Sequence, residues 1–91
     1  MLKIVRSNRF VKDLKLALKR GFNLEELSKV VEMLASRIKL PSKYKDHALS
    51  GEYTNFRECH IKPDWLLIYH IDDEELELLL LFRTGTHSDL F

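Results

Sequence analysis

Hydrophobic residues at helical spacing occupy the first half of the chain. Residues 2–6 alternate weakly and favour a short strand, and Ser7 suits the N-cap of a following helix. The glycine at position 21 is typical of the residue that comes just after a helix ends. The apolar stripe of this first predicted helix consists of Phe10, Val11, Leu14, Ala17 and Leu18.

A second helix is predicted directly after Gly21-Phe22. Asn23 and Glu26 have the spacing of a capping box, and Pro41 is expected to end the helix. Because so short a connection separates the two helices, we expect them to form an antiparallel pair. The apolar stripe of the second helix consists of Leu24, Leu27, Val30, Val31, Leu34 and Ile38.

The second half of the chain follows a strand-like pattern after a polar connection at residues 41–52. Strands are predicted over Phe56–Ile61, Trp65–Ile71 and Glu75–Phe82. The middle segment is apolar on both faces, which indicates a central strand. Tight turns are expected at Lys62-Pro63-Asp64 and at Asp72-Asp73-Glu74, and the last strand places Leu76, Leu78, Leu80 and Phe82 on one face.

The order β-α-α-β-β-β predicts an α+β fold. The last three strands are expected to form an antiparallel meander, with the two-helix hairpin packed on one face of the sheet. The 91 residues suffice for one modest hydrophobic core, and no repeat or linker divides them. We therefore expect a single domain over residues 1–91.

The composition favours a protein of a reducing compartment. The longest apolar run, Leu78–Phe82, is too short to span a bilayer, and Lys3 and Arg6 interrupt the apolar N-terminus where a signal peptide would need continuity. Cys59 is the only cysteine, so an intrachain disulfide is excluded, and we expect it to behave as a small buried apolar residue. Together these features predict a cytoplasmic location without membrane contact.

The net charge of +1 hides a strong asymmetry. Residues 1–51 contain twelve Lys and Arg against five Asp and Glu, whereas residues 52–91 contain three against nine. A basic half is suited to a polyanion or to an acidic partner, although solvated lysine-rich helix faces would give the same balance. The charge pattern alone leaves both interpretations open.

Four titratable residues are candidates for chemistry, namely His47, His60, Asp64 and His87. Each lies in a loop or near a strand end, and a meander can bring such positions to one side of a sheet. Histidine titrates near neutral pH and is therefore suited to proton transfer. Simpler interpretations exist for each: a solvent-exposed loop histidine, a partly buried histidine, a turn aspartate that closes the hairpin, and a polar tail that caps the last strand.

Other residues also have two interpretations. Arg83 either binds a phosphate or pairs with a carboxylate such as Glu77, and Trp65 either belongs to the core or stacks on a base. His70 in mid-strand is interpreted as structural or surface-exposed. The histidines and the aspartate match no zinc-binding spacing, since neither HExxH nor CxxC occurs, so no metal or other cofactor is expected.

Three long motifs add a specific resemblance. The chain strongly resembles the YafQ-type toxins of the RelE/ParE superfamily of toxin–antitoxin modules. The resemblance rests on the element order and on the motifs at Tyr44–Gly51, Phe56–Tyr69 and Arg83–Phe91. The resemblance runs essentially from end to end. It implies a RelE-like fold and a ribosome-dependent mRNA interferase that cuts the codon in the ribosomal A site and is neutralised by a cognate antitoxin. The implied partners are thus the antitoxin, the ribosome with its rRNA, and mRNA.

The resemblance also implies a set of site residues. His47 falls on the histidine of "K-D-H-x-L-x-G", His60 and Asp64 fall on "H-x-x-P-D-W", and His87 falls on "R-T-G-T-H-S". These are the family's catalytic positions, and Phe91 falls on its closing aromatic, which is linked to substrate engagement. The full His/Asp set distinguishes the chain from the ParE branch, which targets gyrase. An inactive member that only binds partner proteins is the remaining alternative.

A metal-free mechanism follows as a hypothesis. We expect His87 to act as the general acid and the His60/Asp64 pair to supply the base, with His47 steadying the phosphate or sharing the base role. Arg83 is expected to bind the phosphate, and Gly85 to bend the chain so that His87 returns over the sheet. The remaining predicted substrate contacts are Phe91 and Trp65, by stacking, and Lys43 and Lys45, by attraction to the RNA backbone.

Overall fold

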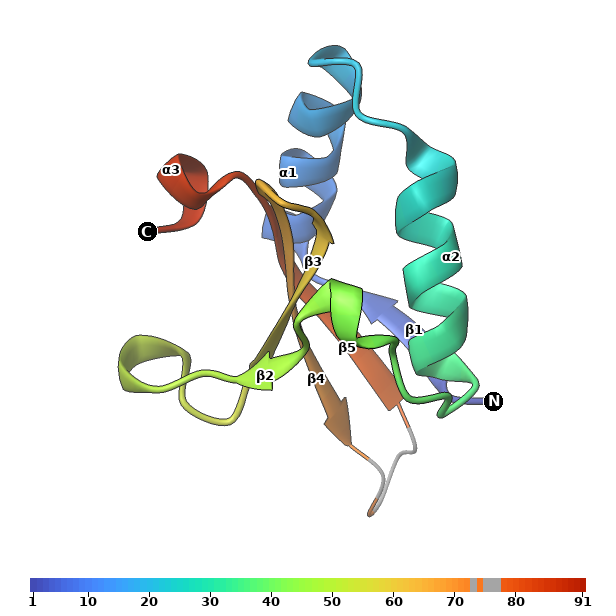
Figure 1. The fold of residues 1–91 in the computed structure, drawn as a ribbon. Coiled ribbons are helices and arrows are strands. Elements are labelled where there is room, and N and C mark those ends of the chain that lie inside the picture. Colours follow the sequence, from blue (N-terminus) through green and yellow to red (C-terminus); the bar gives the residue numbers. More distant parts are fainter. Residues whose placement is uncertain (73, 75–77) are drawn as a thin grey trace.

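The predicted α+β architecture is present in the computed structural model, which describes residues 1–72, 74 and 78–91 (Figure 1). Two regions of the chain that were predicted as loop or tail contain further elements, the short strand β2 and the helix α3. The elements are β1 (Lys3–Arg6), α1 (Asn8–Lys19), α2 (Leu24–Ala35), η1 (Ser42–Tyr44), β2 (His47–Ala48), η2 (Gly51–Tyr53), β3 (Arg57–Lys62), β4 (Trp65–Asp72), β5 (Leu78–Gly85) and α3 (His87–Leu90).

The five strands form one sheet in the order β1-β5-β4-β3-β2. The predicted meander of β3, β4 and β5 is confirmed, with β4 in its interior. The N-terminal strand β1 adds to the free edge of β5 in parallel, and β2 pairs antiparallel with β3 through His47 opposite Glu58. The two-residue β2 was beyond sequence reasoning, because so short a segment carries no period.

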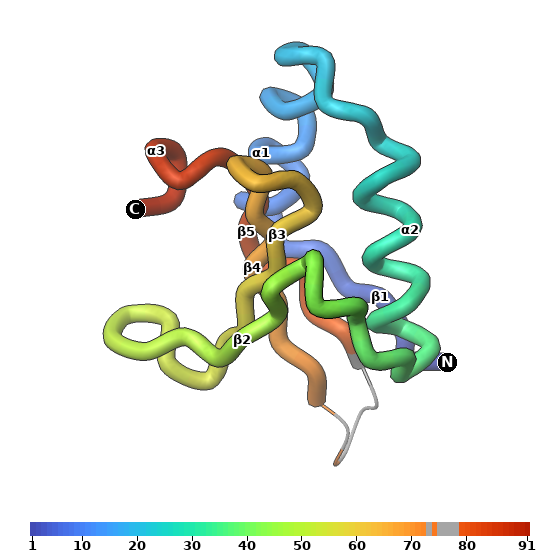
Figure 2. Tube along the Cα trace, in the orientation of Figure 1, coloured from blue at the N-terminus to red at the C-terminus, as the bar shows by residue number. Residues whose placement is uncertain are grey.

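The two long helices lie on the same side of the sheet and run in opposite directions, as the trace in Figure 2 shows. The side chain of Ser7 caps α1 as predicted, and Gly21 has a φ of 86° just beyond its end. Asn23 caps α2, but Glu26 does not complete a capping box in this structure, because its carboxylate lies 2.9 Å from the ammonium of Lys62.

The helix α2 ends at Ala35, earlier than Pro41 predicted. Arg37 adopts a left-handed φ of 58°, and the backbone N–H of Ile38 donates to the carbonyl of Met33 at 2.9 Å. This pattern is the Schellman arrangement that terminates helices, here formed without glycine. Ile38 consequently leaves the helix and is 55% exposed.

The central strand separates two hydrophobic clusters, because successive side chains point to opposite faces. Trp65, Leu67 and Tyr69 pack in the main core with the helices, together with Phe10, Val30 and the buried Cys59. Leu66 and Ile68 form a smaller cluster on the other face with Leu90 of α3. The prediction that this strand is apolar on both faces is confirmed, and burial raises the pKa of the Cys59 thiol.

The last strand extends further than predicted. Residues Arg83, Thr84 and Gly85 pair with Ile68, Leu67 and Leu66, so the start of the tail belongs to β5. Leu79 and Leu81 are buried apolar residues of the strand, and a register shift next to Phe82 separates them from the buried Thr84. Residues 73 and 75–77, with part of the second predicted turn, lie outside the described residues.

Within the described part of the chain, no helix has the length and apolar character needed to cross a membrane.

Candidate functional site

The structure brings the four predicted residues together on one side of the molecule. His47 comes from β2, His60 from β3, Asp64 from the turn between β3 and β4, and His87 from the first position of α3. The ring centroids of His60 and His87 are 5.6 Å apart, and those of His47 and His60 are 6.3 Å apart. The expectation that the sheet gathers these groups is confirmed.

Asp64 is bound to His87 and not to His60, which corrects the predicted pairing. One carboxylate oxygen, Oδ1, lies 2.9 Å from the backbone N of His87 and 2.6 Å from its Nδ1. The backbone N–H of His87, followed by its ring, lowers the pKa of Asp64 below the ordinary value. Asp64 is therefore ionised at neutral pH, and it accepts from Nδ1–H, which leaves Nε2 of His87 facing outward.

His60 has different neighbours. Its Nδ1–H donates to the carbonyl of Pro63 at 3.3 Å, since a carbonyl only accepts. Its Nε2 faces the carboxylate of Glu58 at 3.4 Å. Both nitrogen atoms thus have assigned partners, and the His60 side chain is only 16% exposed.

Glu58 is a site residue that the sequence analysis missed. Its side chain is buried and lies between two imidazoles, 3.6 Å from Nε2 of His47 and 3.4 Å from Nε2 of His60. A buried carboxylate is costly unless positive charge or hydrogen-bond donors accompany it, and the two imidazoles are the groups placed to supply them. The only sequence signal is its position two residues before His60 on the same strand, which gives both side chains one face.

His47 is held by its own loop. Its Nδ1–H donates to the carbonyl of Lys45 at 2.6 Å. Lys45 has a left-handed φ of 49°, which directs this carbonyl toward the His47 ring. This bond fixes the tautomer and directs Nε2 toward Glu58. The short strand β2 therefore serves to place one imidazole beside the buried carboxylate.

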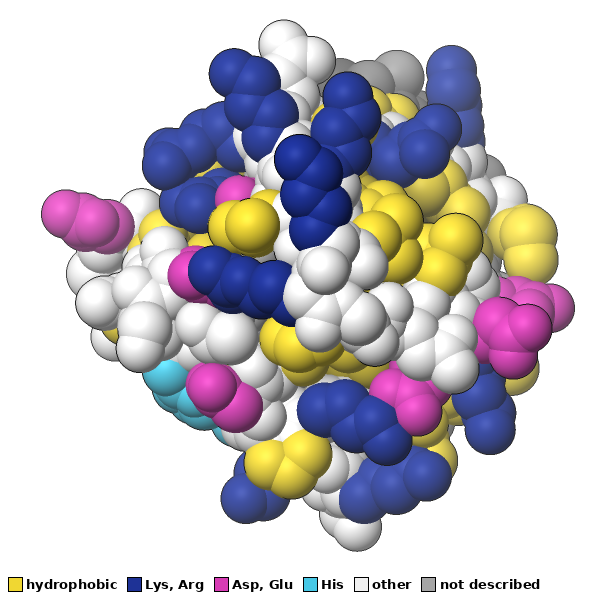
Figure 3. All heavy atoms as spheres, turned by 90° about the horizontal axis from the view of Figure 1, so that it is seen from above, with side chains coloured by type: hydrophobic (Ala, Val, Ile, Leu, Met, Phe, Trp, Pro, Cys, Tyr) yellow, Lys and Arg dark blue, Asp and Glu magenta, His cyan; other side chains and the backbone are white. Residues whose placement is uncertain are grey.

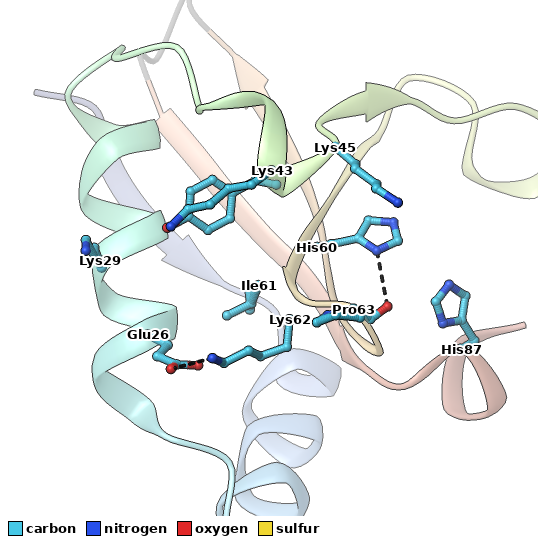
Figure 4. Close-up of a pocket in the computed structure, with 10 residues that line it drawn as sticks. Glu26, Lys29, Lys43, Lys45, His60, Ile61, Lys62, Pro63 and His87 are labelled. Carbon is cyan, nitrogen blue, oxygen red and sulfur yellow. Dashed lines mark hydrogen bonds and ion pairs between the residues drawn. The ribbon is translucent and has the colours of Figure 1, made fainter.

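A hollow of about 630 Å³ opens beside this cluster (Figure 4). His60 and His87 lie at one end of it, and α2 forms the opposite wall. Lys43 and Lys45, both predicted to bind substrate, line it together with Lys29 and Lys62, which the sequence analysis did not single out. Glu26 pairs with Lys62 at 2.9 Å. The hollow is thus a basic recess that leads to two imidazoles.

Arg83 does not point into this hollow. Its guanidinium forms two hydrogen bonds with Asp13 of α1, at 2.7 and 3.1 Å, and its side chain is only 12% exposed. This ion pair raises the pKa of Arg83 further above its ordinary value. The alternative that Arg83 pairs with a carboxylate is therefore the one observed, with Asp13 in the place suggested for Glu77. Its predicted role as a phosphate ligand is not supported by this geometry.

The two predicted aromatic contacts differ sharply in exposure. Trp65 is 2% exposed, its Nε1–H donates to Oγ1 of Thr84 at 2.8 Å, and its ring packs 4.9 Å from Phe22. The stacking interpretation of Trp65 is thus wrong, because no ring face is accessible. Phe91 is 63% exposed and contacts Tyr53 edge-on, so its ring remains available.

Ion pairs between the two halves of the chain do little to offset the charge asymmetry of the sequence. Arg20 of the first half pairs with Asp89 of the second at 2.7 Å. In three other pairs, however, Asp13, Glu26 and Asp46 of the first half bind Arg83, Lys62 and Arg57 of the second. Seen from the end where α1 and α2 are joined, lysine and arginine side chains still cover much of the surface, with acidic groups between them (Figure 3). Among the described residues, no three His, Cys, Asp or Glu side chains are grouped as a metal site.

Comparisons with known proteins identify the family of the chain. The family described as "Bacterial toxin of type II toxin-antitoxin system, YafQ" matches residues 2–91. The mRNA interferase toxin YafQ of Escherichia coli K12 is 42% identical over 86 residues, which are 93% of this chain and 90% of that protein.

Solved structures agree as well. A metal-bound toxin from Helicobacter pylori superposes with a TM-score of 0.93 at 52% identity over the whole of both chains. A chain of the Escherichia coli DinJ–YafQ complex superposes with a TM-score of 0.89 at 40% identity, over 100% of this chain and 99% of that one. The fold and the family match are those of a toxin of a type II toxin–antitoxin system. Within that class, the chain belongs to the YafQ family.

Proposed function

We propose that this chain is a ribosome-dependent mRNA interferase that cleaves the codon in the A site by metal-free acid–base catalysis. The observation that carries the proposal is the pairing of Asp64 with His87, 2.6 Å apart, opposite His60 at the mouth of the basic hollow. The name of the Escherichia coli relative, an mRNA interferase, supports the same activity. Such an enzyme acts where translation occurs, in the cytoplasm.

The reaction needs one proton acceptor and one proton donor. The ribose 2′-OH loses its proton to a base and attacks the neighbouring phosphorus, and the bond from phosphorus to the 5′-oxygen breaks. The 5′-oxygen takes a proton from an acid, which leaves a 2′,3′-cyclic phosphate and a 5′-hydroxyl. Positioned side chains typically contribute about 10²–10⁴-fold each to such transfers.

His87 is suited to the acid role. When its imidazole is doubly protonated, Nδ1–H is held by the ionised Asp64 and Nε2–H is free to donate to the leaving oxygen. The carboxylate of Asp64 compensates the positive charge of the ring in that state. Asp64 thus belongs with the acid, whereas the sequence analysis assigned it to the base.

The base role falls to His60, supported by Glu58 and His47. A proton taken by His60 is stabilised by the buried carboxylate 3.4 Å from its Nε2. His47 faces the same carboxylate from the other side. Because the trio shares one negative charge, a proton gained at one imidazole is compensated within the cluster.

Substrate attraction is proposed to come from the lysine-lined hollow and from Phe91. Lys43 and Lys45 line the hollow beside His60, so they are placed to contact the RNA backbone. The exposed ring of Phe91 is available to stack on a base. Binding through lysines predicts an affinity that falls as salt rises.

The test is primer extension on an mRNA translated in a purified system with ribosomes. The parent chain is expected to produce cuts inside codons only when ribosomes are present, and His87→Ala and His60→Ala are expected to abolish them. His70→Ala is the matched control, because His70 lies on β4 and its Nδ1 bonds the carbonyl of Asn55 instead of the cluster. Unchanged cutting by both site variants, or cutting that a chelator stops and zinc restores, would refute the proposed mechanism.

A cognate antitoxin is proposed as the neutralising partner, as the DinJ–YafQ complex of the relative indicates. It is expected to cover the basic hollow, to block ribosome entry, or to displace the C-terminal tail. The matching measurement is cleavage by the purified toxin–antitoxin complex, which should be absent. A complex that cuts as fast as the free toxin would contradict all three routes.

A further inference from the structure

The tail that bears His87 is fastened to α1 by two ion pairs of opposite polarity. Asp13 binds Arg83, and one helical heptad later Arg20 binds Asp89 through two hydrogen bonds of 2.7 and 3.3 Å. Asp13 also accepts from the backbone N–H of Thr84 at 3.2 Å. The helix α1 and its C-cap residue, Arg20, therefore hold the tail both before and after the glycine bend at Gly85.

Asp89 also organises the turn that starts α3. Its Oδ2 accepts from the backbone N–H of Thr86 at 2.9 Å, and Oγ1 of Thr86 accepts from the backbone N–H of Asp89 at 3.2 Å. A Cβ atom at Gly85 would lie 2.9 Å from Oδ2 of Asp89, so a side chain at position 85 would force this carboxylate to shift. The carboxylate is thus clamped between Arg20 on one side and the first turn of α3 on the other.

His87 is the residue inside that turn. Its backbone N–H and its Nδ1 both contact the same oxygen of Asp64. The two contacts can form together only when the turn has one position and orientation relative to Asp64. Asp64 itself is on an exposed hairpin and does not hold α3 by burial. Leu90 anchors the end of α3 by burial against Leu66 and Ile68. The Arg20–Asp89 pair acts at the first turn, where His87 lies.

We propose that Arg20 and Asp89 are positioning residues for RNA cleavage, which act by holding α3 so that His87 faces the substrate with Asp64 behind it. This inference rests on the proposed function. Neither residue lines the hollow that contains His60 and His87. The Arg20 side chain is 41% exposed, so the pair adds little to the overall stability and its effect is local.

Two variants separate positioning from simple electrostatics. Arg20→Gln removes the clamp and leaves Asp89 in place, and Asp89→Asn keeps an oxygen for Thr86 but loses the charge. Arg9→Gln is the matched control, because Arg9 is an exposed arginine of α1, the helix that Arg20 directly follows. We expect both variants to lower kcat for ribosome-dependent cleavage about 10- to 100-fold, as misplacement of a catalytic group does, with KM and the thermal midpoint equal to those of Arg9→Gln.

The titration of Asp64 gives a second readout with a decisive sign. Charged groups around it are Arg20, Glu26, Lys62 and Asp89, in addition to His87. Removal of the Asp89 charge lowers the pKa of Asp64 if the effect is only electrostatic, because Asp89 raises it. Loss of positioning raises that pKa instead, since the His87 backbone N–H is the main cause that lowers it.

The carboxyl ¹³C shift of Asp64, followed against pH in Asp89→Asn, distinguishes the two. A raised pKa of Asp64 together with a reduced kcat supports the inference. A lowered pKa of Asp64, or cleavage by Arg20→Gln as fast as by Arg9→Gln, overturns it. His87→Ala is run in parallel: if that variant still cleaves, the proposed function itself has failed, whereas an inactive His87→Ala beside a fully active Arg20→Gln refutes only the positioning role.

Discussion

One oxygen of Asp64 accepts from both the backbone N–H and the Nδ1–H of His87, 23 residues further along the chain. This double contact joins a hairpin turn to the start of the C-terminal helix. It fixes the ring of His87 as well as its backbone, so the two residues act as one unit. The partition of the site into a His87–Asp64 pair and a His47–Glu58–His60 trio follows from it.

Replacement of Asp64 by asparagine tests the first unit. Asp64→Asn keeps the size of the side chain but removes the charge that accompanies a protonated His87. We expect kcat for cleavage to fall about 100-fold, within the range for a lost acid–base partner. The measurement is single-turnover cleavage on programmed ribosomes, and a variant with the parent's rate would show that His87 needs no carboxylate.

Replacement of Glu58 by glutamine tests the second unit. Glu58→Gln is nearly isosteric, so the fold should persist, but the buried negative charge between His47 and His60 is lost. We expect a decrease in kcat of about 10²-fold or more, since the base then gains a proton without compensation. His70→Gln provides the control for a polar change on the neighbouring strand, and equal rates for the two variants would exclude Glu58 from the mechanism.

The ion pair between Arg20 and Asp89, which holds the first turn of α3, should be lost in acid. Arg20, and then the backbone N–H of Thr86, lower the pKa of Asp89 from 3.8 to about 2. A depressed carboxyl pKa means that the interaction is complete above pH 3.8 and is lost as pH falls through about 2. Hydrogen exchange of the Thr86 and His87 amides, compared with those of β4, should therefore show loss of protection in that window. Protection that is lost already near neutral pH would contradict the assigned cause.

The last two residues should separate stability from activity. Leu90 is buried against Leu66 and Ile68, so Leu90→Ala is expected to cost about 2–3 kcal/mol of unfolding free energy. Phe91 is 63% exposed, so Phe91→Ala should leave that free energy nearly unchanged and weaken substrate engagement, seen as a higher KM. Urea denaturation and cleavage assays check both, and a Phe91→Ala variant with an unaltered KM would remove this ring from the substrate site.

The periodic parts of the fold were predictable because burial imposes its own period on a sequence. The first helix was predicted from the apolar stripe of Phe10, Leu14 and Ala17. The central strand was predicted from Trp65–Ile71, which is apolar on both faces, and both elements are observed. The end of α2 was not predictable in the same way. The residue with the left-handed backbone that ends it is Arg37, and the sequence has no glycine there to indicate a helix end. The short β2 and α3 escaped prediction because segments of two and four residues show no period.

The sequence by itself determined which groups are available for chemistry: three histidines and an aspartate in motifs specific enough to indicate the toxin family. The tertiary structure alone decided which of them are partners. Asp64 could reach either His60 or His87, and Arg83 either a substrate or a carboxylate, and the fold selects His87 and the Asp13 that lies 70 residues away. Hydrogen bonds act only over about 3 Å, so partners are chosen by how β5, α1 and α3 pack, which no local pattern encodes.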